Sequence, residues 1–230
     1  SGWRMKRFAV GLAAVLLIAG ASHGFAQDRM PPIPEDKLTD AQKRSVAEFK
    51  TARGADARVN GPFVPLLRSP EVMSRARAMG DYLRFRSALP PRLSEFAILV
   101  TAAHWTQAFE WEVHAPIALQ AGVSQSAIDS LWARVPPANL DPELQVIYDV
   151  CIALHEQRSL PAVLRQKAEV LLGEVATLDV IGICGYYALL AMVMNVARTA
   201  VPEGKTLPLP PFRLAPPMAT SWRPATSPGP

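Results

Sequence analysis

The stretch from Glu95 to His114 constrains the fold of this chain more than any other, because it places ionisable side chains at helical spacing within an apolar run. Residues 93–103 are almost continuously apolar, which predicts a helix that is buried on most of its sides. Gln107, Glu110 and His114 follow at i, i+3 and i+7, so they share one stripe of a second helix. A buried Glu95 needs a polar partner. We therefore expect the two helices to pack together, with Glu95 facing Glu110 and His114.

This cluster has the chemistry of a proton relay. Two carboxylates beside an imidazole can divide acid and base roles, because burial and like charge drive their pKa values apart. We predict three catalytic residues, which are His114, Glu110 and Glu95. Glu95 either orients the imidazole or exchanges protons itself. Candidates for substrate binding at the pocket wall are Gln107, Trp111 and His104. A purely structural role is the alternative, with Glu110 a simple helical partner of His114.

Several classes of function are excluded by the remaining residues. Two carboxylates and an imidazole could hold a divalent ion, but no paired-ligand spacing accompanies them, so we predict neither a metal site nor a cofactor. The formal net charge is +4, and three of the positive charges are Arg4, Lys6 and Arg7 at the N-terminus. Without them the chain is near neutral, so we expect no nucleic-acid partner.

The spacing Glu95-x11-Gln107-x2-Glu110-x3-His114 resembles a family pattern. In the alkylhydroperoxidase D-like branch of the carboxymuconolactone decarboxylase family the pattern is Glu-x11-Cys-x2-Cys-x3-His. The decarboxylase branch lacks that cysteine pair and keeps a Glu-x3-His, as this chain does. The resemblance covers roughly residues 65–205. It implies an all-α fold, assembly into homo-trimers or hexamers, and a lyase or isomerase that acts without a cofactor on a small organic acid or lactone.

Two other functions stay open at this stage. The first is a thiol peroxidase, which Gln107 and Glu110 argue against because they occupy the two cysteine positions. The second is a non-catalytic exported binding protein with the same helical shell. A cavity in contact with His114 would favour an enzyme, and a filled core would favour the binding protein. Cys151 and Cys184 lie 33 residues apart on different expected helices. An oxidising compartment would permit a bridge between them, but both lie in apolar helical patterns, where buried free cysteines are common.

The order of segments predicts an exported helical protein. Residues 1–26 resemble a secretory signal with leader residues: basic residues precede the apolar run 8–21, which is shorter than the about 20 residues of a membrane span. We expect cleavage near Ala26, a periplasmic or secreted location, and no membrane association afterwards. Residues 27–64 form an extension with one surface helix, residues 65–205 the helical domain, and residues 206–230 a proline-rich tail.

Within the domain we expect an all-α bundle of about seven helices. The segment 59–67 is predicted to be a loop. In the helix that follows Ser69, the expected inner stripe is Val72, Ala76, Met79 and Leu83, and the arginines, among them Arg84, form a solvated outer face or bind an anionic substrate. The final helix, 174–200, has 18 uncharged residues between Asp179 and Arg198, which favours burial or a subunit interface over a membrane span.

Overall fold

The computed structural model describes residues 28–201, and this part of the chain is built from helices without any strand. The all-α prediction is confirmed. The α-helices are α1 (Asp40–Arg53), α2 (Phe63–Leu66), α3 (Pro70–Phe85), α4 (Pro91–His104), α5 (Ala108–Gln120), α6 (Gln125–Trp132), α7 (Pro142–Ile152), α8 (Ala162–Leu172) and α9 (Glu174–Ala197). The expected bundle of about seven corresponds to α3–α9. The predicted signal, its cleavage site and the tail lie outside the described residues.

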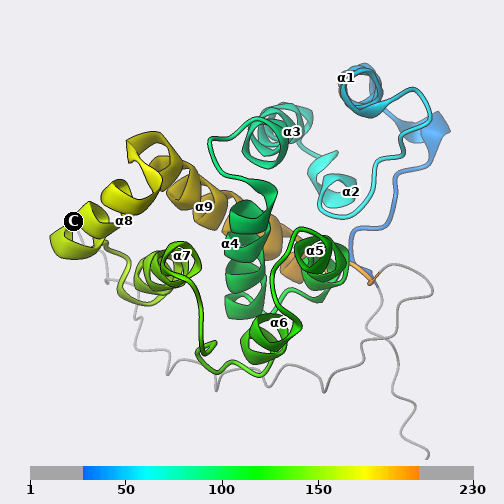
Figure 1. Ribbon diagram of the computed structural model, residues 1–230. Coiled ribbons are helices and arrows are strands. Elements are labelled where there is room, and N and C mark those ends of the chain that lie inside the picture. The colour runs from blue at the N-terminus through cyan, green and yellow to red at the C-terminus, as the bar shows by residue number, and fades with distance from the viewer. Residues whose placement is uncertain (1–27, 202–230) are drawn as a thin grey trace, which may run out of the picture.

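Helix α4 is the centre of the bundle, and α5, α6, α7 and α9 surround it (Figure 1). Every residue from Leu93 to Ala103 is buried, as the apolar run predicts. Pro91 occupies the first turn of α4, where a missing backbone N–H costs nothing. Burying a side chain such as Phe96 or Leu99 stabilises the fold by about 1.5–3 kcal/mol each. Glu95 is thus carried into the interior by a strongly favoured helix.

Helix α9 covers one side of α4 and also contacts α3, α7 and α8. Among the described residues it is the one helix long and apolar enough to cross a membrane by length and composition. More than half of its apolar window is nevertheless buried inside the protein. One side remains uncovered, where its exposed apolar side chains are Val175, Leu178, Leu189, Met192 and Val196.

The N-terminal extension packs onto the bundle through α1 and α2. Helix α1 begins with a capping box, in which the Thr39 hydroxyl accepts a hydrogen bond from the Gln42 amide while the Gln42 side chain accepts one from the Thr39 amide. Phe49 of α1 packs edge-on against Phe63 of α2, with ring centroids 5.4 Å apart. The prediction of a loop over residues 59–67 is therefore partly wrong. Phe63–Leu66 forms a short helix because its apolar residues reach the core.

The predicted inner stripe of α3 is also shifted. Val72 and Met79 are 44% and 45% exposed, and the buried positions are Met73, Ala76, Gly80 and Leu83. The stripe turns toward Gly80 because α9 approaches that side: a Cβ atom at Gly80 would lie 2.2 Å from the Tyr186 hydroxyl oxygen. A glycine adds nothing to a hydrophobic pattern, so the sequence pattern favoured its neighbour Met79.

Candidate functional site

Glu95 of α4 and His114 of α5 meet in the interior, as their spacing predicts. The distance from His114 Nδ1 to Glu95 Oε2 is 2.6 Å, and the two residues are 4% and 6% exposed. A carboxylate accepts, so Nδ1 donates the hydrogen bond and Nε2 is the basic nitrogen of the neutral ring. Burial lowers the pKa of His114, and the bond to Glu95 partly opposes that effect. The pair therefore presents a neutral imidazole of fixed tautomer.

Glu110 lies one turn before His114 on α5 and has a different environment. It is 3% exposed, and neither of its carboxyl oxygens has a hydrogen-bond partner among residues 28–201. Burial raises the pKa of Glu110 well above its ordinary value, which favours the protonated acid. The hydrogen bond that sets the tautomer of His114 is made with Glu95 and not with Glu110. Glu110 is instead an unpaired buried acid.

His114 and Glu110 line one cavity of about 180 Å³. Its other walls come from distant parts of the chain: α1, the segment that enters α2, the end of α3, and α9. Tyr187 of α9 stands edge-on to the His114 ring, with centroids 5.2 Å apart. At the mouth, Gly61 has a φ of +52° and packs so closely on Phe109 that a Cβ atom there would lie 2.6 Å from the ring. The N-terminal extension is thus part of the site.

Two arginines supply positive charge to this cavity. Arg84 of α3 is half-buried and lines the wall, and its Nε atom is buried without a partner in the described part of the chain. Arg53 of α1 also lines the cavity and is held in place by Asp81, whose Oδ1 accepts from Arg53 Nε at 3.2 Å and Nη2 at 2.9 Å. Of the two alternatives predicted for Arg84, the solvated outer face is wrong, and binding of an anionic substrate stays a prediction. The residues next to Arg84 in the sequence gave no indication that it lines the cavity.

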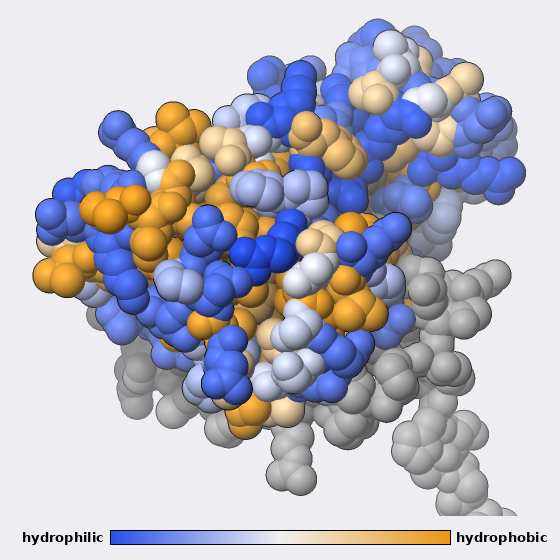
Figure 2. Space-filling view, in the orientation of Figure 1, coloured by the Kyte–Doolittle hydropathy of each residue, from blue (hydrophilic) through white to orange (hydrophobic). Residues whose placement is uncertain are grey.

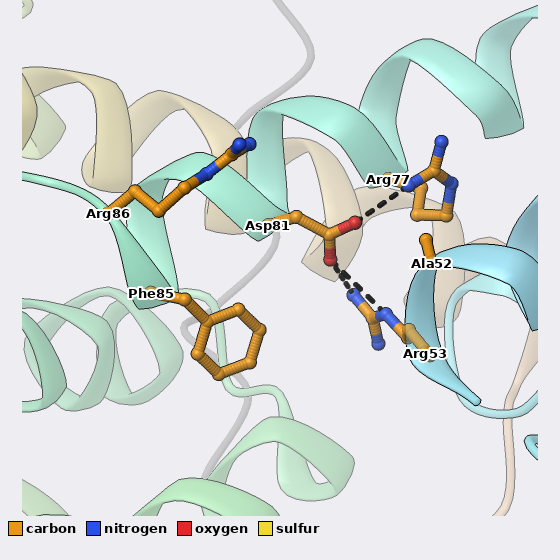
Figure 3. A pocket seen from close by; sticks show the side chains of 6 residues that line it. All are labelled: Ala52, Arg53, Arg77, Asp81, Phe85 and Arg86. Carbon is orange, nitrogen blue, oxygen red and sulfur yellow. Dashed lines mark hydrogen bonds and ion pairs between the residues drawn. The ribbon is translucent and has the colours of Figure 1, made fainter.

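A larger groove of about 620 Å³ is also lined by Arg53, but not by Glu110 or His114 (Figure 3). In it, Asp81 of α3 points between Arg53 and Arg77 and binds both, with a distance of 2.7 Å from Asp81 Oδ2 to Arg77 Nη1. Asp81 therefore balances much of the local positive charge. None of Glu95, Glu110 and His114 lines the groove. Its ion pairs hold α1 against α3 and keep Arg53 in place.

Residues 70–147 match the family model described as the carboxymuconolactone decarboxylase family. Over these residues the chain is therefore similar to the carboxymuconolactone decarboxylase family. The match includes α4 and α5 with Glu95, Glu110 and His114, and it ends before Cys151, so α8 and α9 lie beyond it. None of the curated proteins matches the chain.

The three residues predicted to bind substrate lie outside the cavity of His114. Gln107 caps α5, where its Oε1 accepts from the Phe109 amide at 2.7 Å, and its Nε2 donates to Asn195 on α9 at 2.8 Å. Trp111 is buried against Trp132, with centroids 5.0 Å apart. His104 lines a separate cleft. None of the three lines the cavity of His114.

The family pattern with two cysteines is absent, since Gln107 and Glu110 stand at those positions and the chain has two cysteines in all, Cys151 and Cys184. No group of three or more His, Cys, Asp or Glu side chains suited to a metal ion occurs within residues 28–201. The expectation of a metal-free and cofactor-free site stays a prediction.

Proposed function

We propose that this protein is a lyase or isomerase that works without a cofactor on a small organic acid or lactone. The observation that carries the proposal is one cavity, lined by a neutral His114 held by Glu95 and by an acid, Glu110, whose burial favours its protonated form. Two titratable groups with oppositely shifted pKa values are the arrangement that acid–base catalysis requires. The volume of about 180 Å³ suits a small substrate.

The positions of the side chains suggest a division of labour. Arg84, with Arg53 beside it, binds the carboxylate of the substrate. Nε2 of His114 takes a proton from a carbon next to a carbonyl or carboxyl group, and Glu95 stabilises the imidazolium that forms. Glu110 donates a hydrogen bond to the oxygen on which negative charge develops. In a decarboxylation, loss of carbon dioxide leaves the same negative charge on the carbon. His114, which has first taken up a proton from the carboxylic acid of the substrate or from water, donates that proton to the carbon.

Deuterium exchange tests this function before the natural substrate is known. A panel of small lactones and oxo-acids is incubated with the protein in D2O, and NMR follows deuterium incorporation at carbon and product formation. His114→Gln should lower the rate by about 10²- to 10⁴-fold, because Gln cannot take up and return a proton. Glu110→Gln should cost less, since the imidazole survives. His104→Gln, a matched substitution outside the cavity, should change little.

The alternative is a non-catalytic binding protein, and the same panel separates it from the enzyme. A compound that binds and raises the melting temperature, without any exchange or product in the whole panel, would support the binding protein. Full exchange by His114→Gln would contradict the relay and leave His114 a structural residue.

We further propose that the protein is exported, with cleavage near Ala26. The support is the basic start and short apolar run of the sequence. N-terminal sequencing of protein from the periplasm or medium should begin close to Gln27. Recovery of cytoplasmic protein that still carries Met5 would contradict export.

A further inference from the structure

We propose that Cys151 and Cys184 form an oxidation site for a small hydroperoxide, which converts the two thiols into a disulfide between α7 and α9. The site is separate from the cavity of His114, because neither cysteine lines it. It also differs from a Cys-x2-Cys motif, since its members are 33 residues apart.

The fold brings the two thiols together. Cys151 is in the last turn of α7 and Cys184 is midway along α9, and the two Sγ atoms are 3.1 Å apart and hydrogen-bonded. Both are free thiols. A disulfide bond is about 2.05 Å long, so closure requires the sulfur atoms to move together by roughly 1 Å. The turn that follows Cys151, Ala153–Gln157, is π-helical. Such turns are wider than α-helix and occur often at functional sites.

Neighbouring side chains favour Cys184 as the nucleophile. The pKa of Cys184 is lowered to about 6, first by its hydrogen bond with Cys151, against the effect of burial, and then by His155 and Thr101. His155 projects from the π-helical turn, and its Nε2 lies 3.1 Å from the Thr101 hydroxyl. In contrast, the bond to Cys184 and burial raise the pKa of Cys151. The thiolate attacks and the thiol resolves, as in other reactive dithiols.

Access decides which oxidant can react. Cys151 is 0% exposed and Cys184 is 3% exposed. A thiolate must attack along the axis of an S–S bond, and the bulk of a protein disulfide or of glutathione disulfide prevents that approach to these buried sulfur atoms. Hydrogen peroxide is little larger than water. On the outer side a cleft of about 360 Å³ is lined by His104, and the His104 ring stacks on His155 with centroids 4.7 Å apart. His155 therefore connects the cleft with the thiol pair. His155 itself is half-buried.

The chemistry balances with hydrogen peroxide alone. The Cys184 thiolate attacks one peroxide oxygen, the O–O bond breaks, and hydroxide leaves and takes up the Cys151 proton, giving water and a sulfenic acid on Cys184. The Cys151 thiolate then attacks Cys184 Sγ, the S–O bond breaks and the S–S bond forms. The departing hydroxide takes up a proton and becomes the second water. Two thiols lose two electrons, and one peroxide gains them.

The test uses the full chain, produced in a reducing cytosol. Native protein should leave both thiols unreacted toward a bulky aromatic disulfide reagent, and the unfolded protein should show two. After treatment with hydrogen peroxide, the number of thiols that react in denaturant should fall from two to none, and the mass of the protein should fall by about 2 Da. Peptide mapping should recover Cys151 linked to Cys184. Two thiols that persist at a peroxide concentration sufficient to oxidise the unfolded chain would overturn the proposal, as would rapid reaction of the native thiols with the bulky reagent.

Two matched variants assign the roles. In Cys151→Ser the hydroxyl can still donate to Cys184, but no resolving thiol remains, so peroxide should add about 16 Da and dimedone should trap the sulfenic acid. In Cys184→Ser the remaining Cys151 should stay unmodified over the same time. The opposite pattern would overturn the assignment of Cys184 as the attacking thiol. The wild-type measurements above keep the proposal testable even if one variant does not fold.

Discussion

The burial of Glu110 destabilises the folded protein. A buried carboxyl group without a hydrogen-bond partner destabilises a protein by about 1–3 kcal/mol, and more when it is ionised. Both Glu110 oxygens are in this position within the described residues. A glutamine or leucine would serve the fold as well or better. An acid kept at such a cost, at the wall of a cavity beside His114, is best explained by a demand of the chemistry.

This cost predicts a pH dependence of stability. The pKa of Glu110 is raised in the folded state. Its contribution to the free energy of unfolding is therefore fully present below the pKa of the unfolded chain, and it is lost as the pH rises through the folded-state pKa. Each unit of the shift corresponds to about 1.4 kcal/mol. Glu110→Gln cannot ionise, so its melting temperature should exceed that of the wild type by more at pH 8 than at pH 4.5. Glu112→Gln, on the same helix, is the control. Parallel curves for wild type and Glu110→Gln would contradict a raised pKa.

Arg84 should act on substrate binding. Removing a charge-assisted hydrogen bond costs about 1.5–3 kcal/mol, so Arg84→Gln should raise the KM for a carboxylate substrate roughly 10- to 100-fold. Its effect should be much smaller on an uncharged ester of the same compound. Arg75→Gln is the control, because Arg75 lies on the same helix but is exposed and paired only with exposed Glu71. Equal losses on acid and ester would contradict a role in binding the carboxylate.

At the level of elements, the contact of α3 with α9 shapes the cavity. A Cβ atom at Gly80 would lie 2.2 Å from the hydroxyl oxygen and 2.6 Å from Cζ of Tyr186, and Tyr186 lines the cavity. Gly182 on α9 is the counterpart, since a Cβ atom there would lie 3.2 Å from Leu83. Two glycines thus allow the helices to approach closely enough for the tyrosines of α9 to reach His114.

Gly80→Ala should therefore damage stability and turnover together. Overpacking of this kind costs about 1–3 kcal/mol, and Tyr186 can yield only toward the cavity or by separating the helices. The double variant Gly80→Ala with Tyr186→Phe should recover part of the loss, because it removes the nearest clashing atom. The measurement is a double-mutant cycle on the melting temperature and on deuterium exchange. Strictly additive effects would show that Gly80 and Tyr186 do not interact.

The sequence pattern predicted where the helices lie along the chain better than it predicted which side of each helix is buried. The run 93–103 and the spacing of Glu95 with His114 fixed α4, α5 and their contact, because buried apolar periodicity and a buried acid leave few other solutions. The rotation of α3 could not be predicted in the same way. Its inner face is set by Gly80, which carries no hydrophobic signal. Gln107 was misassigned for a related reason: its stripe position is correct, but as the N-cap of α5 its side chain binds backbone.

At the level of the whole molecule, the cavity joins segments that are far apart in the chain. Arg53, Arg84, His114 and Tyr187 come from α1, α3, α5 and α9. Spacing rules describe neighbours within one helix, so they could find Glu110 beside His114 but not either arginine. The two cysteines illustrate the same limit, because their separation in sequence hid a contact of 3.1 Å. The contact of Glu95 with His114 and the position of Glu110 beside it could be predicted from the sequence, and the two arginines of the cavity wall required the fold.

The exposed side of α9 leads to a prediction about assembly. Its uncovered apolar residues, Val175, Leu178, Leu189, Met192 and Val196, follow the alternating three- and four-residue steps of a helix–helix seam, with Gly182 and Gly185 at the intervening positions. Apolar surface also gathers on the side of the molecule where α7 and α8 lie (Figure 2). The stripe is interrupted where Gly182 packs on Leu83 of α3. Exposed apolar surface of this kind is characteristic of an interface, so we propose that α9 joins copies of this chain into the trimer or hexamer expected from the sequence.

Light scattering coupled to size exclusion measures this assembly directly. The wild-type protein should have a mass several times that of the chain, which is 25.0 kDa before any processing. Leu189→Lys and Met192→Lys place a charge in the middle of the stripe, where burial without a partner would cost several kcal/mol, so each should shift the protein toward the mass of one chain. Val72→Lys is the control, because Val72 is comparably exposed at 44% but lies on α3. Dissociation by the α9 variants alone would locate the interface on α9. A wild-type protein that stays monomeric at high concentration, or α9 variants that assemble normally, would show that this stripe does not join the subunits.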